Sequence, residues 1–480
     1  MRRAGGAGIV AVPAIALAAW LAYGSGFVDY DAVYALVWGD DLAHGHRPPD
    51  LDSRHSPTSH PLATLLSVPL SQLGSGALGV LQAASLLSFG ALGWAAYRLG
   101  ERTFGRPTGA LFAAILLTRP LLVKQALSAN VDVPFVALVL GAAAMEAGRP
   151  RRGWPVLALL AVAGLLRPEA WLLAVAYAAW LWPALGDARS RAAVAALALA
   201  GPAGWALFDW VVAGDPLHSM HETSQAAERI GRPQGADRAV RLAPGYLIDV
   251  LTAAVAVGGA AAALAALRLA RARARVPVAT GLLGGAAFLA LGLGDQPLLA
   301  RYLFVPGAML ALPFAAAATA WWVPGLRAAG PGTAPGGGAG GPLGPRAALA
   351  VTAVFAVAAL ASVPATVRDV DDWRDFSEAR HRADGELPEL LDSAAARRTL
   401  DRCVPATVDY FQTRPLVAYL LGDRRPNDVD TAQPARATGG ALLVARSRAG
   451  EVPHAFRLAA SSRSWALFDR CGPPTPEPRG

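Results

Sequence analysis

The sequence has few charged residues, few cysteines and almost no lysine. Only 16% of its 480 residues are charged and 54% are hydrophobic, whereas a soluble domain usually carries about 25% charged residues. The charged residues are unevenly distributed: long Ala/Leu/Val segments carry almost none, and the charges lie between these segments. This pattern argues against an ordinary soluble domain and is typical of a polytopic membrane protein.

Lys124 is the only lysine, so the net charge of +8 comes almost entirely from arginine. A basic chain often binds nucleic acid through a basic patch. Here the arginines lie in short loops between apolar runs, where they set membrane topology instead. We therefore expect no nucleic-acid partner.

Cys403 and Cys471 are the only cysteines, and their spacing matches no metal-binding motif. The apolar residues 9–23 follow Arg2 and Arg3. We interpret this segment as an uncleaved first membrane span and not as a cleaved signal peptide.

Eleven apolar runs are candidate spans, although several are shorter than the roughly 20 residues that a bilayer prefers. They are 8–24, 75–98, 108–123, 133–147, 153–166, 169–184, 192–213, 246–267, 277–293, 302–323 and 346–364. A cytoplasmic N-terminus makes every inside loop arginine-rich, as the positive-inside rule requires. Eleven spans then place the C-terminus outside, in an oxidising compartment where a Cys403–Cys471 disulfide can persist.

These boundaries predict an all-α membrane protein with a small α/β domain at its C-terminal end. We expect a membrane module at 1–324, a Gly/Pro-rich cytoplasmic linker at 325–345, a last span at 346–364 and an extracytoplasmic domain at 365–480. In that domain, 414–422 reads as a short helix. Residues 440–447 and 463–471 read as strands.

The first extracytoplasmic loop, 25–74, is acidic and holds half of the chain's eight histidines. Tyr30, Tyr34 and Trp38 recur at helical spacing, which predicts a helix with one aromatic face lying in the membrane interface. Asp31 falls at the start of this helix. Its carboxylate could cap the helix, act as a general base, or join nearby histidines in a divalent metal site.

Other unusual polar groups fall in the remaining outer segments. Asp132 lies where apolar sequence resumes, a costly position that is usually functional. Arg119 and Lys124 are cations on the outer side and could bind a phosphate or extend to the membrane interface.

Arg167 and Glu169 lie in a tight turn that a salt bridge would explain. Arg301, beside Tyr302, could hold an anionic headgroup or anchor its helix at the interface. His218 and His221 are expected to be solvated.

These motifs resemble the first periplasmic loop of membrane glycosyltransferases of the GT-C superfamily. The stretch "YDAVYALVWGDDLAHGHRPPD", then "SPTSHPLATLLSVPL" and "ANVDVPFVAL", is similar to the protein mannosyltransferase and aminoarabinose transferase branch. The resemblance covers about residues 9–320. The sequence departs from it at Ala32, which replaces the second member of an acidic pair.

The resemblance implies inverting transfer of a sugar from a polyprenyl phosphate to an acceptor hydroxyl at the outer face of the plasma membrane. It implies Asp31 as general base, with Asp29 as the alternative and Asp132 in support. Arg301, Lys124 or Arg119 would bind the donor phosphate. Tyr34, His60 and Glu169 would contact sugar or acceptor. No cofactor is certain, although a divalent metal is possible. A transporter or flippase of a lipid-linked saccharide, or a non-catalytic scaffold, stays open as an alternative.

Overall fold

The computed structural model describes residues 2–48, 51, 56–323, 343–403, 406–422 and 429–471, with side chains from residue 7 onward. The chain divides into two compact units. The first contains Met1–Gly24, Thr58–Leu62 and Ala83–Arg374, and the second contains Ser25–Pro57, Ala63–Gln82 and Asp375–Gly480. The expected linker 325–345 lies outside the described residues, except for its last three positions.

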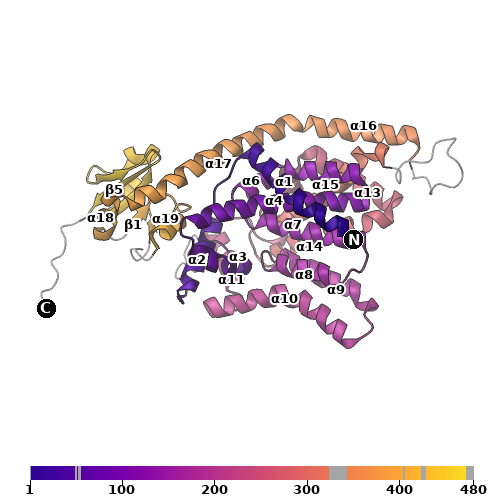
Figure 1. Ribbon diagram of the computed structural model, residues 1–480, viewed down its shortest axis with the longest axis horizontal. Coiled ribbons are helices and arrows are strands. Elements are labelled where there is room, and N and C mark those ends of the chain that lie inside the picture. The colour runs from indigo at the N-terminus through magenta and orange to yellow at the C-terminus, as the bar shows by residue number, and fades with distance from the viewer. Residues whose placement is uncertain are drawn as a thin grey trace. The chain divides into compact units, whose positions relative to one another are not determined.

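Helices make up most of both units (Figure 1). In the N-terminal part they are α1 (Arg2–Tyr23), α2 (Tyr30–Ala43), α3 (Pro61–Ser71), α4 (Gly76–Thr103), α5 (Arg106–Leu117), α6 (Pro120–Leu127), α7 (Asp132–Gly148), α8 (Trp154–Gly164), α9 (Glu169–Leu181) and α10 (Ala188–Ala213). They continue with α11 (His218–Arg229), α12 (Ala236–Leu251), α13 (Ala253–Leu269), α14 (Arg271–Leu293), η3 (Ala300–Leu303), α15 (Phe304–Ala318), α16 (Pro345–Ala361), α17 (Val363–Asp392), α18 (Ala394–Arg402) and α19 (Arg414–Leu421).

The first unit is a bundle of apolar helices, in which α15 packs against α13, α14 and α7 (Figure 1). Within the described residues, five helices are long and apolar enough to cross a membrane, or up to seven when each of two bent pairs counts as one span. All eleven expected spans fall on helices of the structure. The chain is therefore a multi-pass membrane protein with the expected all-α membrane part.

Two expected spans are broken rather than continuous. The run 108–123 becomes α5 and α6, bent by 65°, and the run 246–267 becomes α12 and α13, bent by 109°. Pro120 explains the first break, because proline lacks a backbone N–H and drives the preceding Arg119 into an extended conformation (φ −73°, ψ 123°). At the second break Thr252 has φ 88°, which interrupts helical geometry.

The second unit contains a five-stranded mixed sheet in the order β2-β1-β3-β5-β4. Its strands are β1 (Ala406–Val408), β2 (Asp430–Thr431), β3 (Gly440–Ala445), β4 (Arg457–Ser461) and β5 (Trp465–Arg470). The strands predicted at 440–447 and 463–471 are confirmed as β3 and β5, which pair antiparallel. The helix predicted at 414–422 is confirmed as α19, and Gly422 follows its last residue.

The second unit also has a disulfide between Cys403 and Cys471, whose Cα atoms are 5.4 Å apart. It joins the end of α18 to the segment after β5, across a sequence separation of 68 residues. The sheet therefore lies inside a covalently closed loop.

The aromatic segment of the first loop belongs to this second unit. The predicted helix is confirmed as α2, with Asp29 as its N-cap residue and Asp31 in its first turn. Tyr34 and Trp38 are each 1% exposed. The Tyr34 hydroxyl accepts a hydrogen bond from Arg414 (3.2 Å), and Tyr30 makes an edge contact with Phe411. Tyr30, Tyr34 and Trp38 were expected to face the membrane interface, but they pack within the second unit.

Candidate active site

Four charged side chains from three parts of the first unit meet in one group, which we call the charge cluster: Asp132, Arg167, Glu169 and Arg301. Asp132 is the first residue of α7 and is 1% exposed. It follows a short turn in which Asn130 accepts a hydrogen bond from the Asp132 backbone N–H at 3.3 Å. The positive end of the α7 dipole favours a carboxylate at this position.

Arg167 and Glu169 come from the tight turn between α8 and α9. Pro168 separates them and is the N-cap residue of α9. The Arg167 Nη1 atom lies 2.6 Å from Asp132 Oδ1, and its Nε atom lies 3.2 Å from Glu169 Oε1. All three side chains are 5% exposed or less. The salt-bridged turn expected from the sequence is present, and it extends to a third residue, Asp132.

Arg301 enters the charge cluster from η3, just after α14. Its Nη1 atom lies 3.7 Å from Asp132 Oδ2, and its side chain is 22% exposed. Tyr302 lies beneath both guanidinium groups, with its ring centroid 4.5 Å from Arg167 Cζ and 5.9 Å from Arg301 Cζ. Of the two arginines in the charge cluster, Arg301 is the more exposed and is therefore better placed to contact a ligand.

His60 lies close enough to Arg167 and Arg301 for their charges to affect its pKa. Burial, together with the cations of Arg167 and Arg301, lowers the pKa of His60 to about 3. Its ring also makes an edge contact with Trp205 at 5.8 Å. The imidazole is therefore neutral at physiological pH, and its buried Nδ1 atom has no hydrogen-bond partner among the described residues.

Hydroxyl contacts fix the short segment that carries His60. Thr58 Oγ1 lies 2.6 Å from Thr223 Oγ1, and Ser59 Oγ lies 2.8 Å from Ser219 Oγ. Leu62 donates its backbone N–H to the Leu165 carbonyl at 3.2 Å. Because both sides of His60 are tied to the bundle, its ring is held in place.

Two cations that were expected to bind phosphate lie elsewhere in the first unit. Arg119 is 5% exposed and donates from Nε to the Ile115 carbonyl (3.1 Å) and from Nη1 to the Leu251 carbonyl (2.6 Å). These carbonyls lie at the ends of α5 and α12, so Arg119 satisfies acceptors at both helix breaks. Lys124 Nζ lies 4.1 Å from the ring centroid of Trp373.

The expected bases belong to the second unit. Asp29 and Asp31 begin α2, and Tyr34 follows one turn later. Of the expected site residues, Asp132, Glu169, Arg301 and the neighbouring His60 lie together in the first unit. The first-loop carboxylates Asp29 and Asp31 belong to the second unit.

Arg167 has a central role that the sequence did not predict, because it forms ion pairs with two carboxylates of the charge cluster. The sequence signal for this role was the position of Arg167 in a turn between two apolar runs, on the same expected side of the membrane as Asp132. Among the described residues no group of three or more His, Cys, Asp or Glu side chains could hold a metal ion.

Comparison with known proteins gives a structural match but no sequence match. No family model and no curated protein matches the chain. The crystal structure of ArnT from Cupriavidus metallidurans bound to undecaprenyl phosphate matches with a TM-score of 0.52 and 14% sequence identity, over 96% of this chain and 97% of that chain. The apo structure of ArnT matches with a TM-score of 0.51 and 15% identity, over 97% and 98% of the two chains.

The chain has the fold of ArnT. This agreement extends over nearly the whole of both chains. It confirms the expected fold class, a helical membrane part with a small C-terminal sheet domain. A match at this level of identity shows the fold alone and no particular family or branch.

Proposed function

We propose that this protein is a membrane glycosyltransferase that moves a sugar from a polyprenyl phosphate to an acceptor hydroxyl. The observation that carries the proposal is the charge cluster, in which a partly exposed arginine is held beside a buried carboxylate and a second arginine. The ArnT-like fold supports the donor class, because ArnT has been crystallised with undecaprenyl phosphate.

Arg301 is the proposed phosphate-binding residue. A guanidinium recognises phosphate through charge-assisted and often bidentate hydrogen bonds. Asp132 and Arg167 would position Arg301, since both arginines form ion pairs with the Asp132 carboxylate. Lys124 is a second candidate for the phosphate. Arg119 is a weaker one, because two of its nitrogens already donate to backbone carbonyls.

Asp31 is the proposed general base, and Asp29 is the alternative. The base would accept the proton of the acceptor hydroxyl while that oxygen attacks the anomeric carbon. The bond from this carbon to the donor phosphate oxygen breaks, and the phosphate leaves with the electron pair and its negative charge. Arg301 would stabilise that charge. One displacement inverts the anomeric centre and requires no covalent intermediate.

Tyr34, His60 and Glu169 are the proposed contacts to sugar or acceptor. A neutral His60 imidazole can donate or accept a hydrogen bond to a hydroxyl. The positions of the arginine-rich loops support a cytoplasmic N-terminus and an extracytoplasmic C-terminal domain. Transfer would then take place at the outer face of the plasma membrane.

The test is a transfer assay with purified full-length protein in liposomes that contain radiolabelled polyprenyl-phosphate sugars and candidate acceptors. Arg301→Gln should lower transfer about 10²-fold or more, and Asp31→Asn about 10²–10⁴-fold. Arg241→Gln and Asp371→Asn remove exposed charges of the same type and should leave transfer unchanged. A parallel assay with a chelator tests the divalent metal.

Two outcomes would contradict the proposal. Lipid-linked saccharide that crosses the bilayer without leaving its phosphate would identify a flippase instead. Equal transfer by wild type and Asp31→Asn would remove Asp31 as the base and direct the same test to Asp29 and Asp132.

A further inference from the structure

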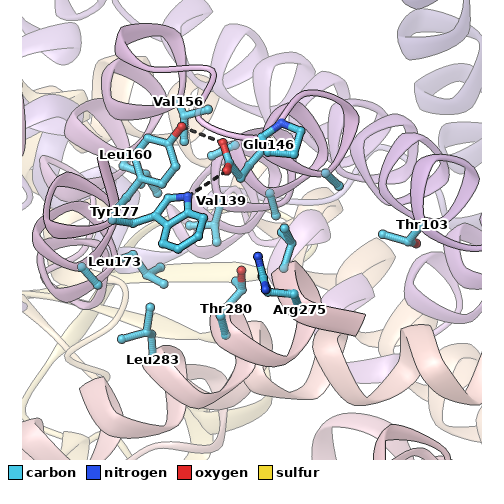
Figure 2. Close-up of a pocket in the computed structure, with 18 of the residues that line it drawn as sticks. Thr103, Val139, Glu146, Val156, Leu160, Leu173, Tyr177, Arg275, Thr280 and Leu283 are labelled. Carbon is cyan, nitrogen blue, oxygen red and sulfur yellow. Dashed lines mark hydrogen bonds between the residues drawn. The ribbon is translucent and has the colours of Figure 1, made fainter. Parts of the chain in front are cut away.

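A second polar site lies at the other end of the helices that carry the charge cluster. Asp132 and Glu169 begin α7 and α9, whereas Glu146 and Tyr177 lie near the ends of the same helices. There a cavity of about 590 Å³ opens among α4, α7, α8, α9 and α14 (Figure 2). This volume lies within the range of small-molecule and cofactor sites, about 300–1,000 Å³.

The one carboxylate that lines the cavity already has several donors. Glu146 is 7% exposed. It accepts hydrogen bonds from the Tyr177 hydroxyl (2.7 Å), Trp180 Nε1 (3.2 Å), and the backbone N–H groups of Arg151 (2.8 Å) and Arg152 (3.3 Å). Figure 2 shows the first two bonds. These donors hold Glu146 against the wall, so the carboxylate is poorly placed to bind a cationic ligand.

The remaining charges that line the cavity are positive. They belong to Arg102 of α4 and to Arg273 and Arg275 of α14. Arg273 and Arg275 are exposed, and the Arg275 guanidinium lies 5.7 Å from the Trp180 ring centroid. Three arginines against one carboxylate leave the cavity with a positive balance, and its exposed cations favour an anionic ligand.

The other walls are apolar. Val139, Val156, Leu160, Leu173 and Leu283 surround the space, and Figure 2 shows them grouped around Glu146 and Arg275. A free inorganic anion would gain nothing from such walls. A ligand that matches both features has an anionic head and an apolar chain.

The position of the cavity in the helix bundle further restricts the class of ligand. Arginines gather at this end, in or beside the short connections that follow α4, α7, α9 and α13. The positive-inside rule assigns this end to the cytoplasmic leaflet. Basic pockets between transmembrane helices on that side bind the headgroups of anionic lipids.

We propose that this cavity binds an anionic glycerophospholipid of the cytoplasmic leaflet. The lipid phosphate contacts Arg273 and Arg275, and one acyl chain enters the apolar space between α9 and α14. The site is separate from the charge cluster and does not depend on the proposed transfer reaction.

The test is a lipid titration of the purified full-length protein in neutral detergent, followed by native mass spectrometry. The probes are dioleoylphosphatidylglycerol, dioleoylphosphatidylcholine and undecaprenyl phosphate. An Arg273→Gln/Arg275→Gln double variant should bind phosphatidylglycerol about 30-fold more weakly, since each basic residue near an anionic headgroup contributes about fivefold. An Arg268→Gln/Arg271→Gln variant is the matched control. It loses two exposed arginines from the same end without touching the cavity, and it should bind like wild type.

A second variant tests whether binding requires the space inside the cavity and not only its positive charge. Thr280→Phe places a ring in the space beside Arg275 and should weaken phosphatidylglycerol binding at unchanged protein charge. Equal affinity in the two arginine double variants, or equal binding of phosphatidylcholine and phosphatidylglycerol, would overturn the proposal. Preferential binding of undecaprenyl phosphate would also overturn it and would assign the cavity to the polyprenyl lipid.

Discussion

Arg167 and Asp132 form an ion pair of 2.6 Å between Nη1 and Oδ1, in which neither side chain is more than 5% exposed. Arg301 approaches the second oxygen of the same carboxylate at 3.7 Å. One buried acid therefore holds together two cations from turns that are distant in the sequence. Without Asp132, these arginines would repel each other inside the protein.

Asp132→Asn should destabilise the first unit. Removing one partner of a buried ion pair leaves an uncompensated charge and costs about 3–5 kcal/mol. We expect a clearly lower Tm in detergent for this variant, and little change for Asp249→Asn, which removes an exposed carboxylate from α12. A double-mutant cycle with Arg167→Met measures the coupling directly. Additive effects of the two substitutions would contradict a direct ion pair.

His60 should make stability depend on pH. Its pKa is about 3 in the folded protein, against an ordinary value of 6.5. Between these values the unfolded chain binds more protons than the folded one, so stability rises with pH and is lost as pH falls below about 6.5. Tm measured from pH 7.5 to 5 should fall less steeply in His60→Gln than in wild type. His454→Gln, which alters an exposed histidine, should keep the wild-type slope; a wild-type slope in His60→Gln would disprove the assignment.

Gly100 should be essential for the contact between α4 and α5. A Cβ atom at this position would lie 2.6 Å from Gly109 Cα, a backbone atom that cannot move aside cheaply. Gly100→Ala should therefore cost about 1–3 kcal/mol through overpacking. Gly79→Ala, on the same helix but with open space around its Cβ position, should be neutral or slightly stabilising. Thermal unfolding of the two variants provides the comparison, and equal Tm values would refute the close contact.

The disulfide should stabilise the second unit by about 4 kcal/mol, because it closes a long loop. Cys403→Ser should lower resistance of the C-terminal domain to proteolysis without changing the helical membrane part. Maleimide labelling checks the pairing itself. The chain has two cysteines, so native protein should label only after reduction. Labelling of both thiols in unreduced protein from membranes would show that the bond does not form there.

The sequence was sufficient to place most elements of the chain. Apolar runs and arginine-rich loops located the membrane helices, because burial in lipid requires long uncharged segments. The spacing of Tyr30, Tyr34 and Trp38 predicted α2, and the short apolar runs at 440–447 and 463–471 predicted β3 and β5. Local propensity also explains the helix break at Pro120 in hindsight. The break at Thr252 carries no comparable local signal, because no proline or glycine marks it.

The sequence by itself determined that this is a membrane protein whose unusual polar groups lie mainly near the ends of its apolar runs. Only the tertiary structure decided which of them meet. Asp132 and Arg301 are paired because α7, the α8–α9 turn and η3 converge, whereas Arg119 instead satisfies carbonyls at two helix breaks. Asp31 and Tyr34 fold with the C-terminal sheet domain. The physical reason is that burial and pairing of a charge depend on neighbours supplied by distant segments, which local sequence does not specify.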